Sequence, residues 1–246
     1  MNATVLAPFA PLRTLTAGAA APLRTLTAGA AALLLTLTAG AAAQDVDLRI
    51  TPRLGMVTPA DWFYAEFAHL GAGDLEWTEA AIQRAAVIGA SAELEIGHNS
   101  LWIRAEVLRT VDGETYVAHA VTHPPVGFQP PYTERTHYYI PSAITIGSLD
   151  LALPTRFQLP FGVQPYFTGG VGAKRYDFDT SPLDNADRSL IPPEEGVVWV
   201  GNAGGGFTIR LSGVNLDFLV RDAISTYWDG LQHDVLWMAG ATWTLF

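Results

Sequence analysis

Residues 197–212 read VVWVGNAGGGFTIRLS, and two kinds of side chain alternate along the whole stretch. The even-numbered face is mixed, with Asn202, Thr208 and Arg210 among its polar groups. The odd-numbered face is apolar or small, with Val197, Trp199, Gly201, Ala203, Gly205, Phe207, Ile209 and Leu211. A period of two indicates a β-strand, whose successive side chains point to opposite faces. The sixteen residues predict a strand far longer than the roughly five or six residues usual in soluble proteins.

The same period recurs from residue 44 to the end of the chain. We predict eight strands, at about residues 47–57, 84–97, 100–111, 137–152, 162–177, 196–212, 214–226 and 233–246. In the fourth strand, Ile144 and Ile146 share one parity, whereas Leu149 and Leu151 share the other. Because one extra residue reverses the two faces of a strand, this change predicts a β-bulge near Gly147.

The composition narrows the class of protein. Only 15% of the residues are charged, compared with about a quarter in typical soluble domains. The formal net charge of −10 argues against nucleic acid as a partner. The chain has no cysteine, which excludes disulfides, thiolate nucleophiles and cysteine zinc sites. A chain so poor in charge must keep much apolar surface away from water.

Alternation alone does not say which face of a strand is inside. In a soluble sandwich the apolar face forms the core, whereas in a membrane barrel it meets lipid and the polar face lines the lumen. Strand length favours the barrel, and so do connections that alternate between long and short. Long links are expected at residues 58–83, 112–136 and 178–195, and short turns at 98–100 and 212–213. Only residues 77–86 have a helical pattern, of one or two turns.

The polar face of the predicted strands carries charges of both signs. The lumen of an eight-stranded barrel is just wide enough for side chains to fill it, so opposite charges from neighbouring strands are expected to pair there. We predict a structural polar network in the lumen, made of Arg49, Arg53, Glu93, Glu95, Arg104, Glu106, Arg210, Asp217 and Arg221. The predicted fold is an all-β, eight-stranded, antiparallel, up-and-down transmembrane barrel.

The N-terminal residues have a different character. APLRTLTAGAA occupies residues 10–20, recurs unchanged at 21–31 and degenerates to ALLLTLTAGAA at 32–42. The last copy has the length of a signal-peptide core, arginines precede it, and the alanines at 41–43 fit a cleavage site. Residues 1–43 are therefore predicted to be a signal peptide with an 11-residue tandem repeat, and residues 44–246 to be the barrel. A disordered alanine-rich arm is the alternative.

The segment LPFGVQPYFTGGVG, residues 159–172, resembles the start of a strand in small bacterial outer-membrane β-barrel proteins, the OmpW-like or outer-membrane β-barrel domain group. The resemblance covers roughly residues 44–246. It implies a place in the outer membrane, with outer-membrane lipid and the barrel-assembly machinery as partners. It also implies a structural role, or passive handling of small solutes, by a monomer. No cofactor and no enzymatic activity are expected.

The closing strand departs from the pattern of this family. Trp237, Trp243 and Leu245 share the parity expected to face lipid, whereas the terminal Phe246 lies on the opposite parity with Thr242. The terminal aromatic residue usually belongs to the lipid-facing parity in this family. The assembly signal is therefore shifted by one residue.

Two other functions fit parts of the sequence. A secreted barrel of lipocalin type would bind a small apolar ligand, but it would need an apolar lumen. The segment HNS, residues 98–100, resembles the His-x-Ser of outer-membrane lipid A deacylases, although these residues also suit a hairpin turn. His119 and His123 have the spacing of a metal site on a helix, which Pro124 and Pro125 disfavour. We therefore predict no catalytic, cofactor or metal residues.

Overall fold

The computed structural model describes residues 47–59, 64–69, 75–96, 101–126, 130–155, 157, 159–181, 197–227 and 230–245. These residues belong to one compact unit, Ala41–Phe246. The predicted signal peptide, the turn at residues 98–100 and Phe246 lie outside the described residues and stay predictions. None of the described residues forms a helix that is long and apolar enough to span a bilayer.

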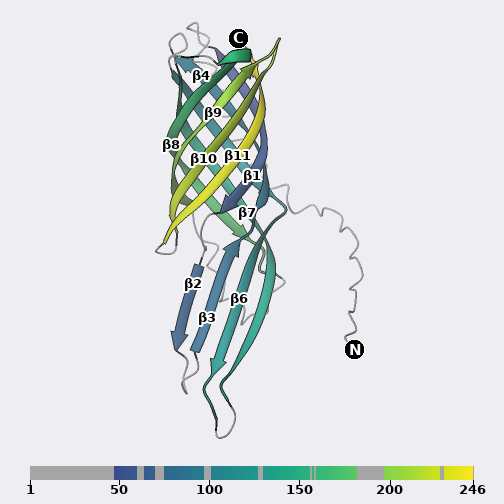
Figure 1. The fold of residues 1–246 in the computed structure, drawn as a ribbon, viewed down its shortest axis with the longest axis vertical. Coiled ribbons are helices and arrows are strands. Elements are labelled where there is room, and N and C mark those ends of the chain that lie inside the picture. Colours follow the sequence, from purple (N-terminus) through teal and green to yellow (C-terminus); the bar gives the residue numbers. More distant parts are fainter. Residues whose placement is uncertain are drawn as a thin grey trace, which may run out of the picture. The chain divides into compact units, whose positions relative to one another are not determined.

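Eight antiparallel strands form a closed ring, as the sequence predicts (Figure 1). They follow each other around it in the order β7-β5-β4-β1-β11-β10-β9-β8, and β8 pairs again with β7. Closure leaves no free strand edge within the ring. The strands are β1 (Leu48–Pro59), β4 (Ala85–Ile96), β5 (Leu101–Val111), β7 (Tyr132–Pro154), β8 (Val163–Phe178), β9 (Val197–Arg210), β10 (Asn215–Tyr227) and β11 (Gly230–Thr244).

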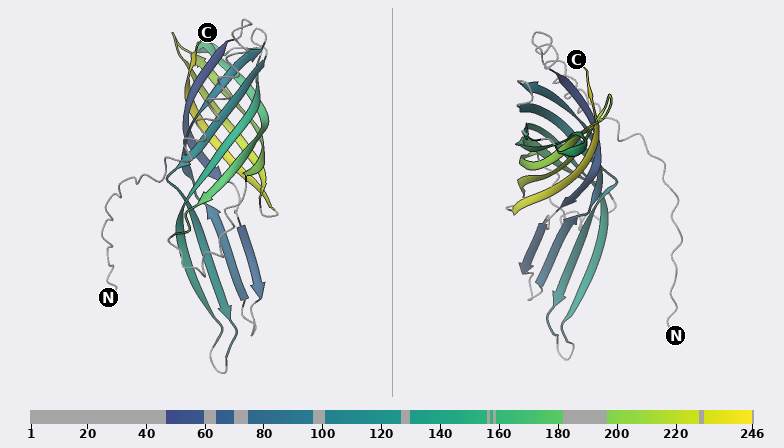
Figure 2. Two further views of the ribbon diagram at one scale, coloured as in Figure 1. Left: turned by 180° about the vertical axis from the view of Figure 1, so that it is seen from behind. Right: turned by 45° about the horizontal axis from the view of Figure 1, so that its top comes forward.

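Three further strands continue the sheet outside the ring. They are β2 (Tyr64–His69), β3 (Leu75–Ile82) and β6 (Gly113–His123), in the order β2-β3-β6-β7. The first half of β7 pairs with β6, and its second half pairs with β5 and β8. Figures 1 and 2 show these strands beyond one end of the ring, which we call the extension end. The opposite end, where the 3₁₀ turn η3 (Pro160–Gly162) precedes β8, is the turn end.

The extension corrects two predictions. The links predicted at residues 58–83 and 112–136 contain paired strands rather than irregular loops. Residues 77–86 are not helical, because residues 77–82 belong to β3, whose backbone pairs with β6 from Leu75↔Thr122 to Ile82↔Thr115. The partner strand, which the helical pattern cannot reveal, overrides the local preference.

The predicted bulge near Gly147 is also wrong. The register between β7 and β8 runs without interruption from Ser142↔Phe178 to Pro154↔Tyr166. The extra residue is Asp112, between β5 and β6, and its φ of 52° lies in the left-handed region. The apolar residues of β7 change from the inner to the outer face without an inserted residue. Ile146 points inward and is 2% exposed, whereas Leu149 points outward and is 53% exposed.

The inside of the ring has two parts of different polarity. Towards the extension end it is mainly an apolar core, which contains one buried ion pair, and towards the turn end it is filled by polar and charged side chains. The outer face of the strands carries large exposed apolar side chains, among which Trp199 on β9 is 81% exposed. The apolar core continues into the extension, and its members include Val57, Val87, Leu108, Ile140, Ile144, Ile146, Val200, Leu219 and Leu236.

Candidate functional site

The middle of the ring is filled by charged side chains that alternation directs inward. Six of the nine predicted lumen residues meet here, and each is at most 4% exposed. They are Arg53 on β1, Glu93 on β4, Arg104 and Glu106 on β5, and Asp217 and Arg221 on β10.

Arg53 lies at the centre of the ion pairs. Its guanidinium contacts Asp217 Oδ2 at 2.6 Å and Glu106 Oε2 at 2.7 Å, with Glu93 Oε1 further away at 3.5 Å. Arg104 Nε donates to the same Glu93 oxygen at 2.7 Å, and Arg104 Nη2 lies 3.8 Å from Asp217 Oδ2. Tyr166 on β8 completes this group, because its hydroxyl donates to Asp217 Oδ1 at 2.8 Å.

Arg221 joins the cluster to the opposite wall. Its Nη2 lies 2.6 Å from Glu106 Oε1, and its Nη1 donates to Asp150 Oδ2 on β7 at 2.8 Å. Asn202 and Ser148 also donate to the Asp150 carboxylate, at 3.2 and 3.0 Å. Asp150 is not among the lumen residues predicted from the sequence. Its place between the outward-facing Leu149 and Leu151 is the signal that would have located it.

We call these charged residues the plug. It contains three guanidinium groups and four carboxylates, and all are buried: Arg53, Arg104, Arg221, Glu93, Glu106, Asp150 and Asp217. A buried charge without a partner is very unfavourable, so the network holds its members in one arrangement. These seven side chains fill the middle of the lumen.

Glycines in the wall make room for the plug. A Cβ atom at Gly170 would lie 2.3 Å from Asp150 Oδ1, and one at Gly206 would lie 2.7 Å from the Tyr166 hydroxyl. The same Cβ atoms would also lie 2.2 Å from the backbone oxygen of Leu149 and 2.1 Å from that of Phe218, so the glycines on the inner face of β8 and β9 serve packing.

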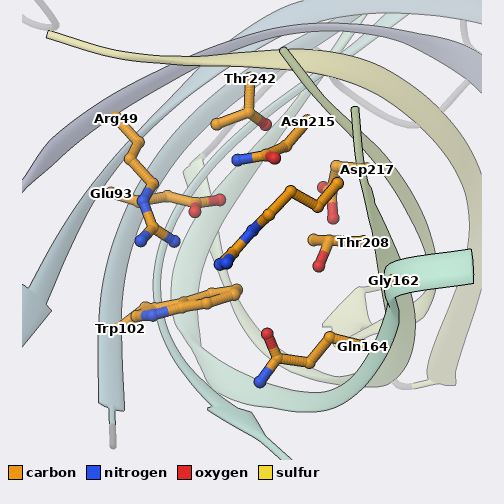
Figure 3. A pocket seen from close by; sticks show the side chains of 10 residues that line it. Arg49, Glu93, Trp102, Gly162, Gln164, Thr208, Asn215, Asp217 and Thr242 are labelled. Carbon is orange, nitrogen blue, oxygen red and sulfur yellow. The ribbon is translucent and has the colours of Figure 1, made fainter. Parts of the chain in front are cut away.

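The remaining three predicted lumen residues lie at the turn end, where Arg49 and Arg210 line a small cavity and Glu95 pairs with Arg49 (Figure 3 shows Arg49 at the cavity). Arg49 Nη2 is 2.5 Å from Glu95 Oε2, and the Arg49 guanidinium stacks 4.9 Å from the centre of the Trp102 ring. Arg210 lines the cavity but is exposed, because β9 ends there. The cavity has a volume of about 50 Å³, and Gln164 also lines it. This space suits a few water molecules.

A second ion pair lies on the other side of the plug. Lys174 on β8 is fully buried, and its Nζ lies 2.5 Å from Asp234 Oδ2 on β11. The Lys174 ammonium also lies 4.9 Å from the centre of the Tyr176 ring. The inward parity of these positions is the sequence signal for this pair, which the predicted network did not include.

The histidines considered for a metal lie on a strand. His119 and His123 belong to β6, so their spacing does not bring them together as it would on a helix. The His123 ring stacks on Tyr132, with ring centres 4.6 Å apart. Within the described ranges no group of three or more potential ligands is arranged to hold a metal ion.

Comparison with known proteins finds similarity at the level of structure. No protein-family model and no curated protein matches the chain. Neisserial surface protein A is similar with a TM-score of 0.45 and 10% identity, over 82% of this chain and 98% of that one. LpxR from Salmonella typhimurium has a TM-score of 0.28 and 9% identity, over 78% of this chain and 99% of that one. The translocator domain of the autotransporter NalP from Neisseria meningitidis has a TM-score of 0.22 and 10% identity, over 93% of this chain and 99% of that one.

Proposed function

We propose that the chain is a bacterial outer-membrane β-barrel whose lumen is closed by the plug. Its role is structural, or passive towards small solutes, and not that of an open channel. One observation carries this proposal: the ring is apolar outside and charged inside at the same level. Leu149 is exposed on the outer face of β7, and the next residue, Asp150, is buried in the plug.

The polarity of the wall favours lipid over water as the outer solvent. Outward side chains such as Trp199, Phe167 and Val171 are more than half exposed. On a water-soluble barrel so many exposed apolar groups would form an aggregation-prone patch. A lipocalin-like barrel would reverse this arrangement, with polar groups outside and an apolar ligand space inside. The buried plug is incompatible with an apolar ligand at that level.

The height of the apolar wall fits a bilayer. On β11 and the residue that follows it, the outward apolar side chains run from Val235 to Leu245. Ten steps of about 3.3 Å along a strand tilted by roughly 40° give a height of roughly 25 Å, which is the apolar band expected of an outer-membrane barrel. Beyond this band, towards the extension end, the outer face becomes charged and carries Arg109, Arg175 and Asp177.

Closure of the lumen argues against conduction. The plug fills the ring, and the cavity at the turn end has room for only a few water molecules. We assign no catalytic role to the described residues. The lipid-modifying alternative depends on His98 and Ser100, which lie outside them. The OmpW-like resemblance, a monomeric state and assembly by the barrel-assembly machinery remain part of this proposal.

The test is fractionation of a Gram-negative host that expresses the full-length chain. We expect the protein in the outer membrane, with a shift in gel mobility between unheated and heated samples that marks a folded barrel. The purified protein in a planar bilayer should show no steady channel current. Recovery from the soluble periplasm without a heat-dependent shift would refute the membrane assignment, and a stable open-channel current would refute the closed lumen.

A further inference from the structure

Two arginines project from the outer wall at the level where it stops being apolar. Arg109 on β5 and Arg175 on β8 both pair in register with Thr145 on β7, so they lie side by side across three strands. Arg109 Nη1 donates to Thr145 Oγ1 at 3.1 Å and lies 3.4 Å from Asp177 Oδ2. Arg175 Nε contacts Asp177 Oδ1 at 2.7 Å. Two guanidinium groups thus share one carboxylate, and the cluster carries a net positive charge.

This cluster is accessible from outside the ring. The side chain of Arg175 is 60% exposed, and those of Arg109 and Asp177 are 30% exposed. Among the described residues, Asp177 is the only ion-pair partner of Arg175, through Nε, so its two terminal amino groups are directed to the surroundings. A planar guanidinium with free amino groups is well suited to a phosphate, which it binds through two parallel hydrogen bonds.

On the side of the arginines that faces the turn end, the outer wall is apolar. Gly147 pairs with Val107 and Ala173, and a Cβ atom there would have no neighbour within 4 Å. Further towards the turn end than Gly147, Leu149 and Val171 are exposed on the outer face. The surface next to the cluster therefore offers small side chains and then an apolar wall, as acyl chains require.

On the opposite side of the arginines, the outer face of the extension is aromatic. Tyr116 on β6 pairs in register with Tyr139 on β7, with ring centres 5.3 Å apart. The Tyr116 hydroxyl lies 2.7 Å from His137 Nδ1, which fixes the two rings against each other. Tyr139 is 62% exposed. Aromatic rings with adjacent hydrogen-bonding groups present both a flat apolar face and a polar edge.

We propose that this outer surface of β5–β8 binds a phosphorylated glycolipid of the outer leaflet. Arg109 and Arg175 hold its phosphate. The apolar wall on their turn-end side contacts its acyl chains, and Tyr116 and Tyr139 contact its sugar. The inference rests on the proposed function, because it requires the apolar wall to lie in lipid, and it also requires the extension end to face the cell exterior. The apolar wall, the arginine pair and the tyrosines follow one another along the same outer face, so the acyl chains, a phosphate and the sugar of one molecule can contact all three surfaces together.

Nearby acidic groups limit where the phosphate sits. Glu114 pairs in register with Pro141, and the backbone N–H of Asp179 donates to the Pro141 carbonyl, so both acids lie further from the apolar wall than Thr145. They disfavour a phosphate at that outer level. The negative group is therefore held at the arginine pair itself, at the boundary of the apolar wall.

The test measures binding of bisphosphorylated lipid A to the full-length protein in detergent micelles, with native mass spectrometry as readout. Each arginine near a membrane surface contributes about fivefold in affinity for an anionic lipid, so R109Q/R175Q should bind roughly 30-fold more weakly. R175Q alone, at the exposed position, should bind roughly fivefold more weakly. R210Q removes an exposed arginine at the turn end and is the matched control, with unchanged affinity.

Further ligands separate the three contacts. Lipid A without phosphates should bind wild type and R109Q/R175Q equally, and inorganic phosphate alone should not compete. Y116A/Y139A should weaken lipid A but leave the sugar-free phosphatidylglycerol unaffected. Equal binding of bisphosphorylated lipid A by wild type and R175Q, in protein that shows the heat-dependent shift, would overturn the inference. Absence of that shift in the wild type would instead count against the membrane barrel itself.

Discussion

The plug makes a quantitative prediction about which of its charges the fold can lose. Arg53 is the only member whose guanidinium contacts three carboxylates, and its replacement by methionine keeps a side chain of similar length without the charge. After Arg53→Met, two guanidinium groups remain beside four buried carboxylates. Glu106→Gln, in contrast, leaves three guanidinium groups beside three carboxylates. The two variants change neighbouring atoms but move the charge balance in opposite directions.

The structure gives the size of each effect. Loss of one partner from a buried ion pair costs about 3–5 kcal/mol, and Arg53→Met should reach the upper end because three carboxylates lose a partner. After Glu106→Gln, Arg53 keeps Asp217 at 2.6 Å and Arg221 keeps Asp150 at 2.8 Å. Its cost should be that of an altered buried hydrogen-bonding group, about 1–3 kcal/mol. The double variant should cost less than the sum, because the two side chains are in contact.

The assay is equilibrium urea unfolding of the protein refolded in lipid vesicles, followed by tryptophan fluorescence. The unfolding free energies of wild type, both single variants and the double variant form one cycle. The heat-dependent gel shift is the control that each variant folds at all. A cost for Glu106→Gln equal to or greater than that for Arg53→Met would show that charge balance in the plug does not govern stability.

Three further predictions concern the wall and the lumen. Leu149→Arg should lower the unfolding free energy in vesicles by about 2–4 kcal/mol, because it places a charge in the apolar band. Tyr139→Arg, on the extension, should change the unfolding free energy by no more than about 0.5 kcal/mol. Equal unfolding free energies for the two variants would contradict a lipid boundary between these two levels of β7. Gly204→Ala should cost about 1–3 kcal/mol, since its Cβ would lie 2.5 Å from Arg221 Cβ, and Gly201→Ala, with no atom within 4 Å, should be neutral. Liposomes that contain the wild type should not swell in small sugars, and swelling would refute a closed lumen.

Much of the ring could be predicted from the sequence because its strands are long and strictly alternating. Parity alone placed six charged residues in the lumen, and it also placed Trp237 on the outer face. Parity does not report depth along the strand, which is why Arg210 was expected in the lumen and instead lies exposed at the end of β9.

The extension could not be predicted, because it depends on pairing between distant segments. The residues of β3 lack strict alternation, and their alanines suit a helix as well as a strand. Their partner β6 lies more than thirty residues away in the chain, from Thr115 to Thr122. Backbone pairing with that partner decides the structure, and no local pattern encodes it.

The change of phase in β7 has a physical origin that alternation alone cannot distinguish from a bulge. Inside the ring the apolar Ile146 gives way to the plug residue Asp150, and outside it the arginine level at Thr145 gives way to the exposed Leu149. Both faces therefore reverse polarity within a few residues, while the backbone register with β8 continues unbroken. A strand that passes from water into lipid must do this, because the apolar face is the inner one in water and the outer one in lipid. If the wall lies in lipid as proposed, this reversal without an inserted residue marks the membrane boundary on β7, between the levels of Thr145 and Leu149.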